Sequence, residues 1–283
     1  MALGLQDTSP SINCDRPQPL PMLGPEEIRS RAIDLSGASG HSHAAAGDLS
    51  WDPTWEQVFR ASPWGRYPPE ELIRFMARNF FSAPERRAVR VLELGCGPGA
   101  NLWFLSREGF DTYGIDGSRT AIVKAAGRLT TEGLTAHLEV GDILSLESVY
   151  RGLCFDAIVD IGCLQHNRMV YVERILDQVS LLLIPNGRVF AMMIARGSYG
   201  DGTGTEVEPG TFTSVTEGPA QGVGLCHFFS LEEMEALFSR FRDAHIECSA
   251  RSLNGRRHWV KHWVVDAVSR RPVPESLSVP TSR

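Results

Sequence analysis

The segment at residues 91–101, VLELGCGPGAN, constrains the fold of this chain more than any other. It starts as a short apolar run, turns through three glycines and continues into residues that favour a helix. Glycine has no Cβ atom, so the chain can turn tightly there and a bound nucleoside can approach the backbone. A strand, a glycine-rich turn and a helix in this order are typical of nucleotide sites in open α/β sheets. The segment therefore predicts a doubly wound α/β fold.

Apolar runs alternate with helical patterns along the following residues, as β-α-β units require. We expect strands at residues 90–94, 111–115, 136–140, 155–161 and 187–194, and helices at 101–108, 118–129, 146–151, 168–183 and 231–241. Residues 245–251 and 258–268 are expected to form two more strands, joined at Asn254 and Gly255, a dipeptide that favours a tight hairpin. The pattern predicts a mostly parallel sheet that ends in an antiparallel hairpin.

Two helices are expected before the first strand. Asp52 can cap the first helix, and Pro53 suits its first position. The second helix opens at residues 68–71 and carries an apolar stripe, formed by Leu72, Phe75, Met76 and Phe80. After the fifth strand, residues 197–224 are rich in Gly, Thr and Glu and exceed an ordinary connection, so we expect a lid that orders with substrate.

Three acidic residues follow or end successive predicted strands, at the edge where open α/β sheets bind ligands. Glu93 lies two residues before the first glycine, where an acid repels a pyrophosphate but suits a cofactor that carries an ammonium and a sulfonium. This disfavours the alternative of an NAD enzyme. Asp116 stands where a carboxylate can accept both ribose hydroxyls. Asp142 can accept from an adenine amino group while Ile143 packs against the ring.

The runs VLELGCGPG, YGIDGS and VGDIL resemble the first three motifs of class I S-adenosylmethionine-dependent methyltransferases, over residues 51–269. The resemblance implies S-adenosylmethionine as cofactor and a doubly wound seven-stranded sheet, mostly parallel with an antiparallel C-terminal hairpin, with N-terminal helices forming part of a lid. It also implies the cofactor-binding residues, which are Glu93, Gly95, Gly97, Ala100, Asn101, Asp116, Gly117, Ser118, Asp142, Ile143 and Asp160.

Methyl transfer from a sulfonium is an in-line displacement, so the protein mainly aligns the nucleophile and excludes water. By the same resemblance Asp160 lies beside the methyl group, and the segment after it carries His166. We consider both residues catalytic candidates, with His166 as a general base. The alternative for His166 is a hydrogen-bonded histidine at the start of the next helix.

Substrate contacts are expected from the variable segments: Trp64, Tyr67, Gln165, His166, Arg196 and His227. Trp64 and Tyr67 could cover the cofactor, although Trp64 could equally pack in the core. Arg196 follows the fifth strand, where a guanidinium could clamp a carboxylate, and a solvated surface arginine is the alternative. These residues point to a small, carboxylate-bearing acceptor, with S-methylation of a methionine-like amino acid as one specific case. RNA or protein methylation, and a non-catalytic cofactor-binding module, stay open as alternatives.

Charge and composition limit the partners. The formal net charge of −6 offers no overall attraction to a phosphate backbone, so we expect no nucleic acid partner. The cysteines include no C-x-x-C pair, and we expect no metal. The start MALGLQDTSP lacks a signal-peptide pattern and no run reaches membrane-spanning length, so we expect a cytoplasmic protein without membrane contact. A homodimer stays open.

The domain organisation predicted from these patterns has four segments. They are a flexible leader at residues 1–49, an N-terminal helical lid at 50–89, a class I methyltransferase domain at 90–270 and a flexible tail at 271–283.

Overall fold

The computed structural model describes residues 51–272. The leader predicted at residues 1–49 and nearly all of the tail predicted at 271–283 therefore lie outside the described residues.

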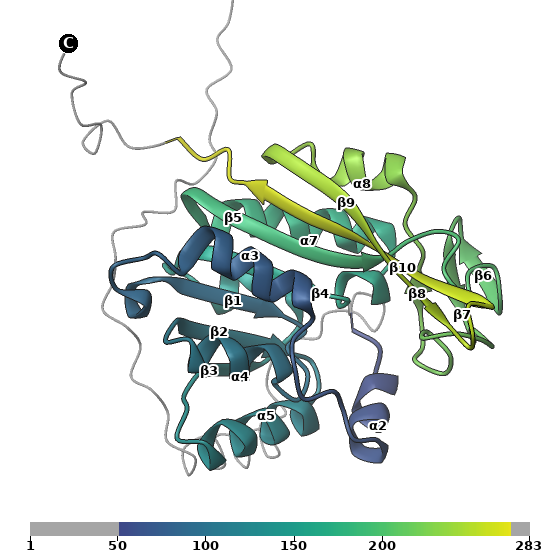
Figure 1. Cartoon of the computed structure of the whole chain (residues 1–283), viewed down its shortest axis with the longest axis horizontal. Helices are drawn as coiled ribbons and strands as arrows, with labels where there is room; N and C mark the ends of the chain where they lie inside the picture. Colours follow the sequence, from purple (N-terminus) through teal and green to yellow (C-terminus); the bar gives the residue numbers. More distant parts are fainter. Residues whose placement is uncertain (1–50, 273–283) are drawn as a thin grey trace, which may run out of the picture.

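One seven-stranded sheet forms the centre of the molecule (Figure 1). Its strands in chain order are β1 (Arg90–Leu94), β2 (Asp111–Asp116), β3 (His137–Val140), β4 (Phe155–Ile161), β5 (Leu183–Ile194), β9 (Arg242–Leu253) and β10 (His258–Val268). Their spatial order is β3-β2-β1-β4-β5-β10-β9. The first five strands are parallel, and β10 pairs antiparallel with both β5 and β9. The predicted parallel sheet with its antiparallel hairpin is confirmed.

Helices cover both faces of this sheet, as alternating β-α units require. One face carries α3 (Glu70–Phe80), α4 (Ala100–Arg107) and α5 (Arg119–Thr131). The other carries α6 (Leu146–Val149), α7 (Met169–Leu182) and α8 (Leu231–Phe238), which pack in the largest apolar cluster. Three single turns, η1 (Arg86–Ala88), η2 (Ile143–Ser145) and η3 (Leu164–His166), complete the helical structure of the α/β unit.

The two helices before the first strand have different roles. Helix α2 (Thr54–Ala61) lies at the carboxyl ends of the strands and packs against α5 (Figure 1). Asp52 lies at its start as expected, where its Oδ1 accepts a hydrogen bond of 2.8 Å from the amide of Thr54, the first helical residue, although Pro53 takes the N-cap position. By contrast, α3 is part of the core: Phe75 stacks on Phe190 of β5 at 4.8 Å between ring centroids. The prediction of a lid over the whole of residues 50–89 is therefore wrong for α3.

Residues 197–224 were expected to form a lid that orders with substrate; that role stays a prediction, but the segment is more regular than its composition indicated. The segment contributes to a three-stranded antiparallel sheet of β6 (Thr205–Glu208), β7 (Thr211–Thr213) and β8 (Cys226–His227). Phe212 and Phe228 belong to a separate small apolar cluster that also includes Ile194 of β5. The strands are too short for their alternation to stand out among the glycines, so composition alone gave no strand signal.

Candidate active site

A cavity of about 210 Å³ opens at the carboxyl ends of β1, β2 and β4. The strand order reverses between β1 and β4, and open α/β sheets bind ligands at such a switch point. The strand ends and the turns after them supply one wall, formed by Glu93, Gly95, Cys96, Gly97, Ala100, Asn101, Asp116, Gly117, Gly141, Ile143, Ile161, Gly162, Cys163, His166 and Asn167. The segment before β1 supplies the other, formed by Trp51, Asp52, Trp55, Phe59, Trp64, Gly65, Tyr67 and Pro69.

The glycine-rich turn has the backbone geometry that its sequence predicts. Gly95 has a φ of +59°, and a Cβ atom there would lie 2.3 Å from the Cys163 sulfur. Gly99 has a φ of +78° and begins α4, where a Cβ atom would lie 2.9 Å from that of Ala125. Only glycine fits both positions, so the turn keeps its backbone open toward the cavity.

Asp116 closes β2 and is tied to the glycine-rich turn. One carboxylate oxygen accepts from the Gly97 amide and the other from the Ser118 amide, both at 2.8 Å. Burial raises the pKa of this carboxyl above its usual range, with a smaller contribution from the nearby charge of Glu56. Two amides thus hold the carboxylate at the cavity wall, and its expected contact with the ribose stays a prediction.

Glu93 is a buried acid that lacks a full set of partners. Its Oε1 accepts 2.6 Å from the Asn101 side-chain amide, while Oε2 is buried without a hydrogen-bond partner among residues 51–272. Burial raises its pKa well above the usual range, and the charges of Asp116 and Asp160 add to this effect. A buried carboxylate oxygen of this kind is costly unless a cation or donor binds it. It therefore fits the ammonium group of S-adenosylmethionine.

Asp160 is a second buried acid, near the end of β4. It stands just before Ile161 and Gly162, which line the cavity. Its Oδ1 accepts from the amides of Cys163 and Leu164 at 3.1 and 3.0 Å, and its Oδ2 is buried without a partner in the described chain. Burial raises its pKa to about 7. A second buried acid next to Glu93 gives the site a local preference for positive charge, which fits a sulfonium cofactor.

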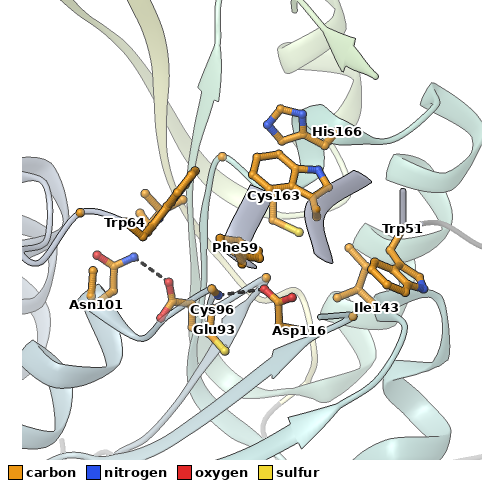
Figure 2. Close-up of a pocket in the computed structure, with 18 of the residues that line it drawn as sticks. Trp51, Phe59, Trp64, Glu93, Cys96, Asn101, Asp116, Ile143, Cys163 and His166 are labelled. Atoms are coloured by element: carbon orange, nitrogen blue, oxygen red, sulfur yellow. Dashed lines mark hydrogen bonds between the residues drawn. The ribbon is translucent and has the colours of Figure 1, made fainter. Parts of the chain in front are cut away.

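Trp51 and Ile143 lie at one end of the cavity (Figure 2), and Gly117 also lines it. The indole of Trp51 packs so closely on Gly117 that a Cβ atom there would lie 2.5 Å from its Cδ2. Asp142 does not line the cavity: its Oδ1 accepts 2.8 Å from the Leu144 amide and caps η2. The predicted contact of Asp142 with adenine stays a prediction, and Trp51 is an aromatic wall that we did not predict.

Aromatic side chains of α2 and of the segment after it form the roof of the cavity; Trp64 was expected there, whereas Trp55 and Phe59 were not predicted. Trp55, Phe59 and Trp64 pack together, with ring centroids 5.1 to 5.8 Å apart. Phe59 and Trp64 lie over Gly97, whose added Cβ atom would meet them at 3.6 and 3.8 Å. The spacing of Trp51, Trp55 and Phe59 is the signal that could have found them, since residues four apart share one face of a helix.

His166 lines the cavity as an uncharged ring. Its Nδ1 lies 2.8 Å from the Leu225 carbonyl oxygen, so Nδ1 carries the proton and Nε2 the lone pair. The ring packs on Trp55 with centroids 4.6 Å apart, and burial lowers its pKa to about 4. Nε2 is 3.3 Å from the side-chain nitrogen of Gln165, whose oxygen accepts from the Ile194 amide. The histidine is firmly positioned, and it is a weak base.

Three of the predicted substrate residues, Gln165, Arg196 and His227, do not line the cavity. His227 is fully buried between Thr211, at 2.6 Å, and Glu233, at 3.3 Å, and joins β7, β8 and α8. Arg196 is exposed and its guanidinium lies beside Gly210, outside the cavity. Among the described residues, no lysine or arginine lines the cavity. The structure therefore brings Trp64, Tyr67 and His166 together and leaves Arg196 and His227 apart.

Residues 51–272 contain no cluster of three or more His, Cys, Asp or Glu residues arranged to hold a metal ion. They also contain no helix of the length and hydropathy needed to cross a membrane.

Comparison with known proteins identifies the domain. Residues 91–187 match a family model described as a methyltransferase domain. Three uncharacterized methyltransferases of Schizosaccharomyces pombe are each 36% identical to this chain over 73 residues, which is 26% of this chain. The matched part covers 49% of each yeast protein, so the chain spans about half the length of these relatives.

Solved structures show the same fold at low sequence identity. TehB from Haemophilus influenzae superposes with a TM-score of 0.53 at 16% identity, over 76% of this chain and 67% of that one. Phosphoethanolamine N-methyltransferase 2 of Haemonchus contortus, solved with phosphomonomethylethanolamine and S-adenosylhomocysteine, gives 0.52 at 18% identity, over 77% and 56%. The N-terminal domain of EvdMO1 with S-adenosylhomocysteine bound gives 0.51 at 22%, over 88% and 98%. The sheet order agrees with the fold of these structures, and residues 91–187, which include the glycine-rich turn, are similar to a methyltransferase domain.

Proposed function

We propose that this chain transfers the methyl group of S-adenosylmethionine to a small acceptor whose reacting end is uncharged or cationic. The observation that carries the proposal is the polarity of the cavity, whose described lining contains acids and aromatic rings but no lysine or arginine. Aromatic faces attract cations and apolar groups, and buried acids disfavour a carboxylate. The carboxylate clamp expected at Arg196 has no support from this arrangement.

The chain's own residues provide binding and alignment for the transfer. Glu93 would hold the cofactor's ammonium and Asp116 its ribose hydroxyls, and Asp160 would favour the positive charge near the methyl group. Bound S-adenosylmethionine supplies an electrophilic methyl group on a sulfonium. Trp55 and Trp64 would exclude water and align the acceptor behind that methyl, the main requirement of an in-line displacement.

A sulfur acceptor suits this site best. Sulfur packs favourably against aromatic rings, which wall the cavity here. The Nε2 lone pair of His166 can accept a proton, but with a pKa of about 4 the ring is too weak a base for an alcohol. A thiol gives up its proton far more readily, and a thioether needs no proton removed. We therefore favour a thiol or thioether as acceptor atom.

A matched series of aromatic thiols tests the proposal. All three compounds offer an aromatic thiol as the nucleophile, and they differ in the charge of the substituent opposite it. The probes are 4-methylbenzenethiol, 4-(aminomethyl)benzenethiol and 4-mercaptobenzoate, and the readout is formation of S-adenosylhomocysteine. We expect kcat/KM for the neutral and cationic thiols to exceed that for the carboxylate by about ten-fold or more. Preference for 4-mercaptobenzoate would contradict the proposed polarity. Cofactor binding without turnover of any probe would instead favour a non-catalytic module.

A further inference from the structure

A second cavity, of about 270 Å³, shares Trp64 and Gly65 with the cofactor cavity. We name it the basic cleft because three cations line it, Arg66, Lys124 and Arg128. Pro98, Thr131 and Glu132 complete its lining. The chain as a whole carries a net charge of −6, so the local excess of positive charge in the cleft is opposite in sign to the net charge of the chain.

The cations of the basic cleft lack acidic partners. Within residues 51–272, none of Arg66, Lys124 and Arg128 forms an ion pair with a carboxylate. Glu132 also lines the cleft and its charge acts on Arg128, but its Oε2 accepts 2.6 Å from the Trp103 indole nitrogen and lies 3.6 Å from Arg107. The positive charge of the cleft is therefore only partly compensated.

Contacts to the main chain hold these like charges together. Arg128 donates to the Arg66 carbonyl oxygen, and Lys124 donates to that of Phe59. Arg128 Nε is buried without a hydrogen-bond partner in the described part of the chain. Burial and the Arg66 charge both lower the pKa of the Arg128 guanidinium. A bound anion stabilises two guanidinium groups whose like charges act on each other in this way.

We propose that the basic cleft binds a phosphate group that bridges Arg66 to Lys124 and Arg128 of α5. Arg66 lies two residues after Trp64, which lines the cofactor cavity. An anion in the cleft would fix this segment against α5 and keep Trp64 in place over the cofactor. Anion and cofactor then bind with positive coupling, and each raises the affinity of the other by the same factor. This coupling rests on the proposed function, whereas anion binding itself does not.

Calorimetry at constant ionic strength, with and without saturating S-adenosylhomocysteine, tests the cleft. The probes are inorganic phosphate and phenyl phosphate. We expect both to bind the wild type in the millimolar range or tighter, and Arg66→Gln to weaken both by about ten-fold or more, as for a lost charged hydrogen bond. The control Arg78→Gln, an exposed residue of α3 that lines neither cavity, should not change binding. If phenyl phosphate binds more tightly than inorganic phosphate, the natural ligand is a larger organic molecule with a terminal phosphate. Equal affinities indicate that the natural ligand is a free phosphate ion.

A charge reversal provides the second variant. Glutamate in Arg66→Glu can pair with Arg128 or Lys124 across the cleft, so we expect a folded protein that no longer binds phosphate. Its affinity for S-adenosylhomocysteine should match that of the phosphate-saturated wild type. The proposal is overturned if phosphate does not bind in the millimolar range, if Arg66→Gln binds it as the wild type does, or if S-adenosylhomocysteine displaces it. Displacement would mean that these cations serve the cofactor's own carboxylate.

Discussion

Asp160 should make the protein without cofactor less stable as pH rises. Its pKa is raised from 3.8 to about 7 by burial, so the folded state disfavours the ionised form. Below pH 3.8 the group is protonated in both states and has no effect. Above pH 7 it is ionised in both states, and the folded state is destabilised by about 4 kcal/mol, from 1.36 kcal/mol for each unit of the pKa difference. The loss of stability develops between about pH 4 and pH 7.

The substitution Asp160→Asn removes this charge and keeps an oxygen for the amides of Cys163 and Leu164. Its amide nitrogen takes the place of the unpartnered Oδ2, which costs about 2 kcal/mol. The net gain at pH 8 is therefore about 2 kcal/mol, or a rise in Tm of about 4–8 °C. At pH 5 the wild-type carboxyl destabilises the folded state by under about 2 kcal/mol, which the cost of the unpartnered amide nitrogen offsets. The stability gained by Asp160→Asn therefore falls to nearly zero at this pH.

Thermal unfolding of both proteins at pH 5 and pH 8, without cofactor, measures this difference. Glu235→Gln, at an exposed position of α8, serves as the matched control for a removed acid and should change little at either pH. A Tm for Asp160→Asn that is equal to or below that of the wild type at pH 8 would refute the reasoning. So would a gain of the same size at both pH values.

Three further outcomes are expected. Asp116→Ala should fold and weaken S-adenosylmethionine by about 1–3 kcal/mol, measured by calorimetry, and unchanged affinity would remove Asp116 from the site. Binding of S-adenosylmethionine at pH 7 should release protons from Asp160 and Glu93, more than S-adenosylhomocysteine does, because only the former carries a sulfonium. Titrations in buffers of different ionisation enthalpy check this, and equal proton release for both ligands would count against it. Arg196→Ala should leave kcat/KM for the preferred thiol near its wild-type value, and a large loss would return Arg196 to the site.

The sheet and the acids of the site could be predicted because the physics behind them is local. Strand and helix periods differ, and the glycine-rich turn admits only glycine at Gly95 and Gly99. The carboxyl ends of parallel strands lie along one edge of the sheet, so Glu93 and Asp116 had to lie near one another, whereas Asp160 was given only by the family resemblance.

The rest depended on long-range packing. An apolar stripe has the same sequence pattern whether it faces a core or a cavity. The sequence therefore could not distinguish the role of α2 from that of α3. Arg196 follows β5 as expected, but its amide bonds to the Phe229 carbonyl and its side chain turns toward Gly210. That direction is set by β6, β7 and β8, whose small sheet had no clear sequence signal.

A crystal structure of the protein with S-adenosylhomocysteine tests the central claim most directly. We expect the ribose hydroxyls on Asp116, the ammonium within hydrogen-bonding distance of Glu93, and the adenine between Ile143 and Trp51. The sulfur should face the side of the cavity formed by Cys163 and His166. A nucleoside bound outside this cavity, or an ammonium remote from Glu93, would contradict the assignment of the buried acids to the cofactor's positive charges.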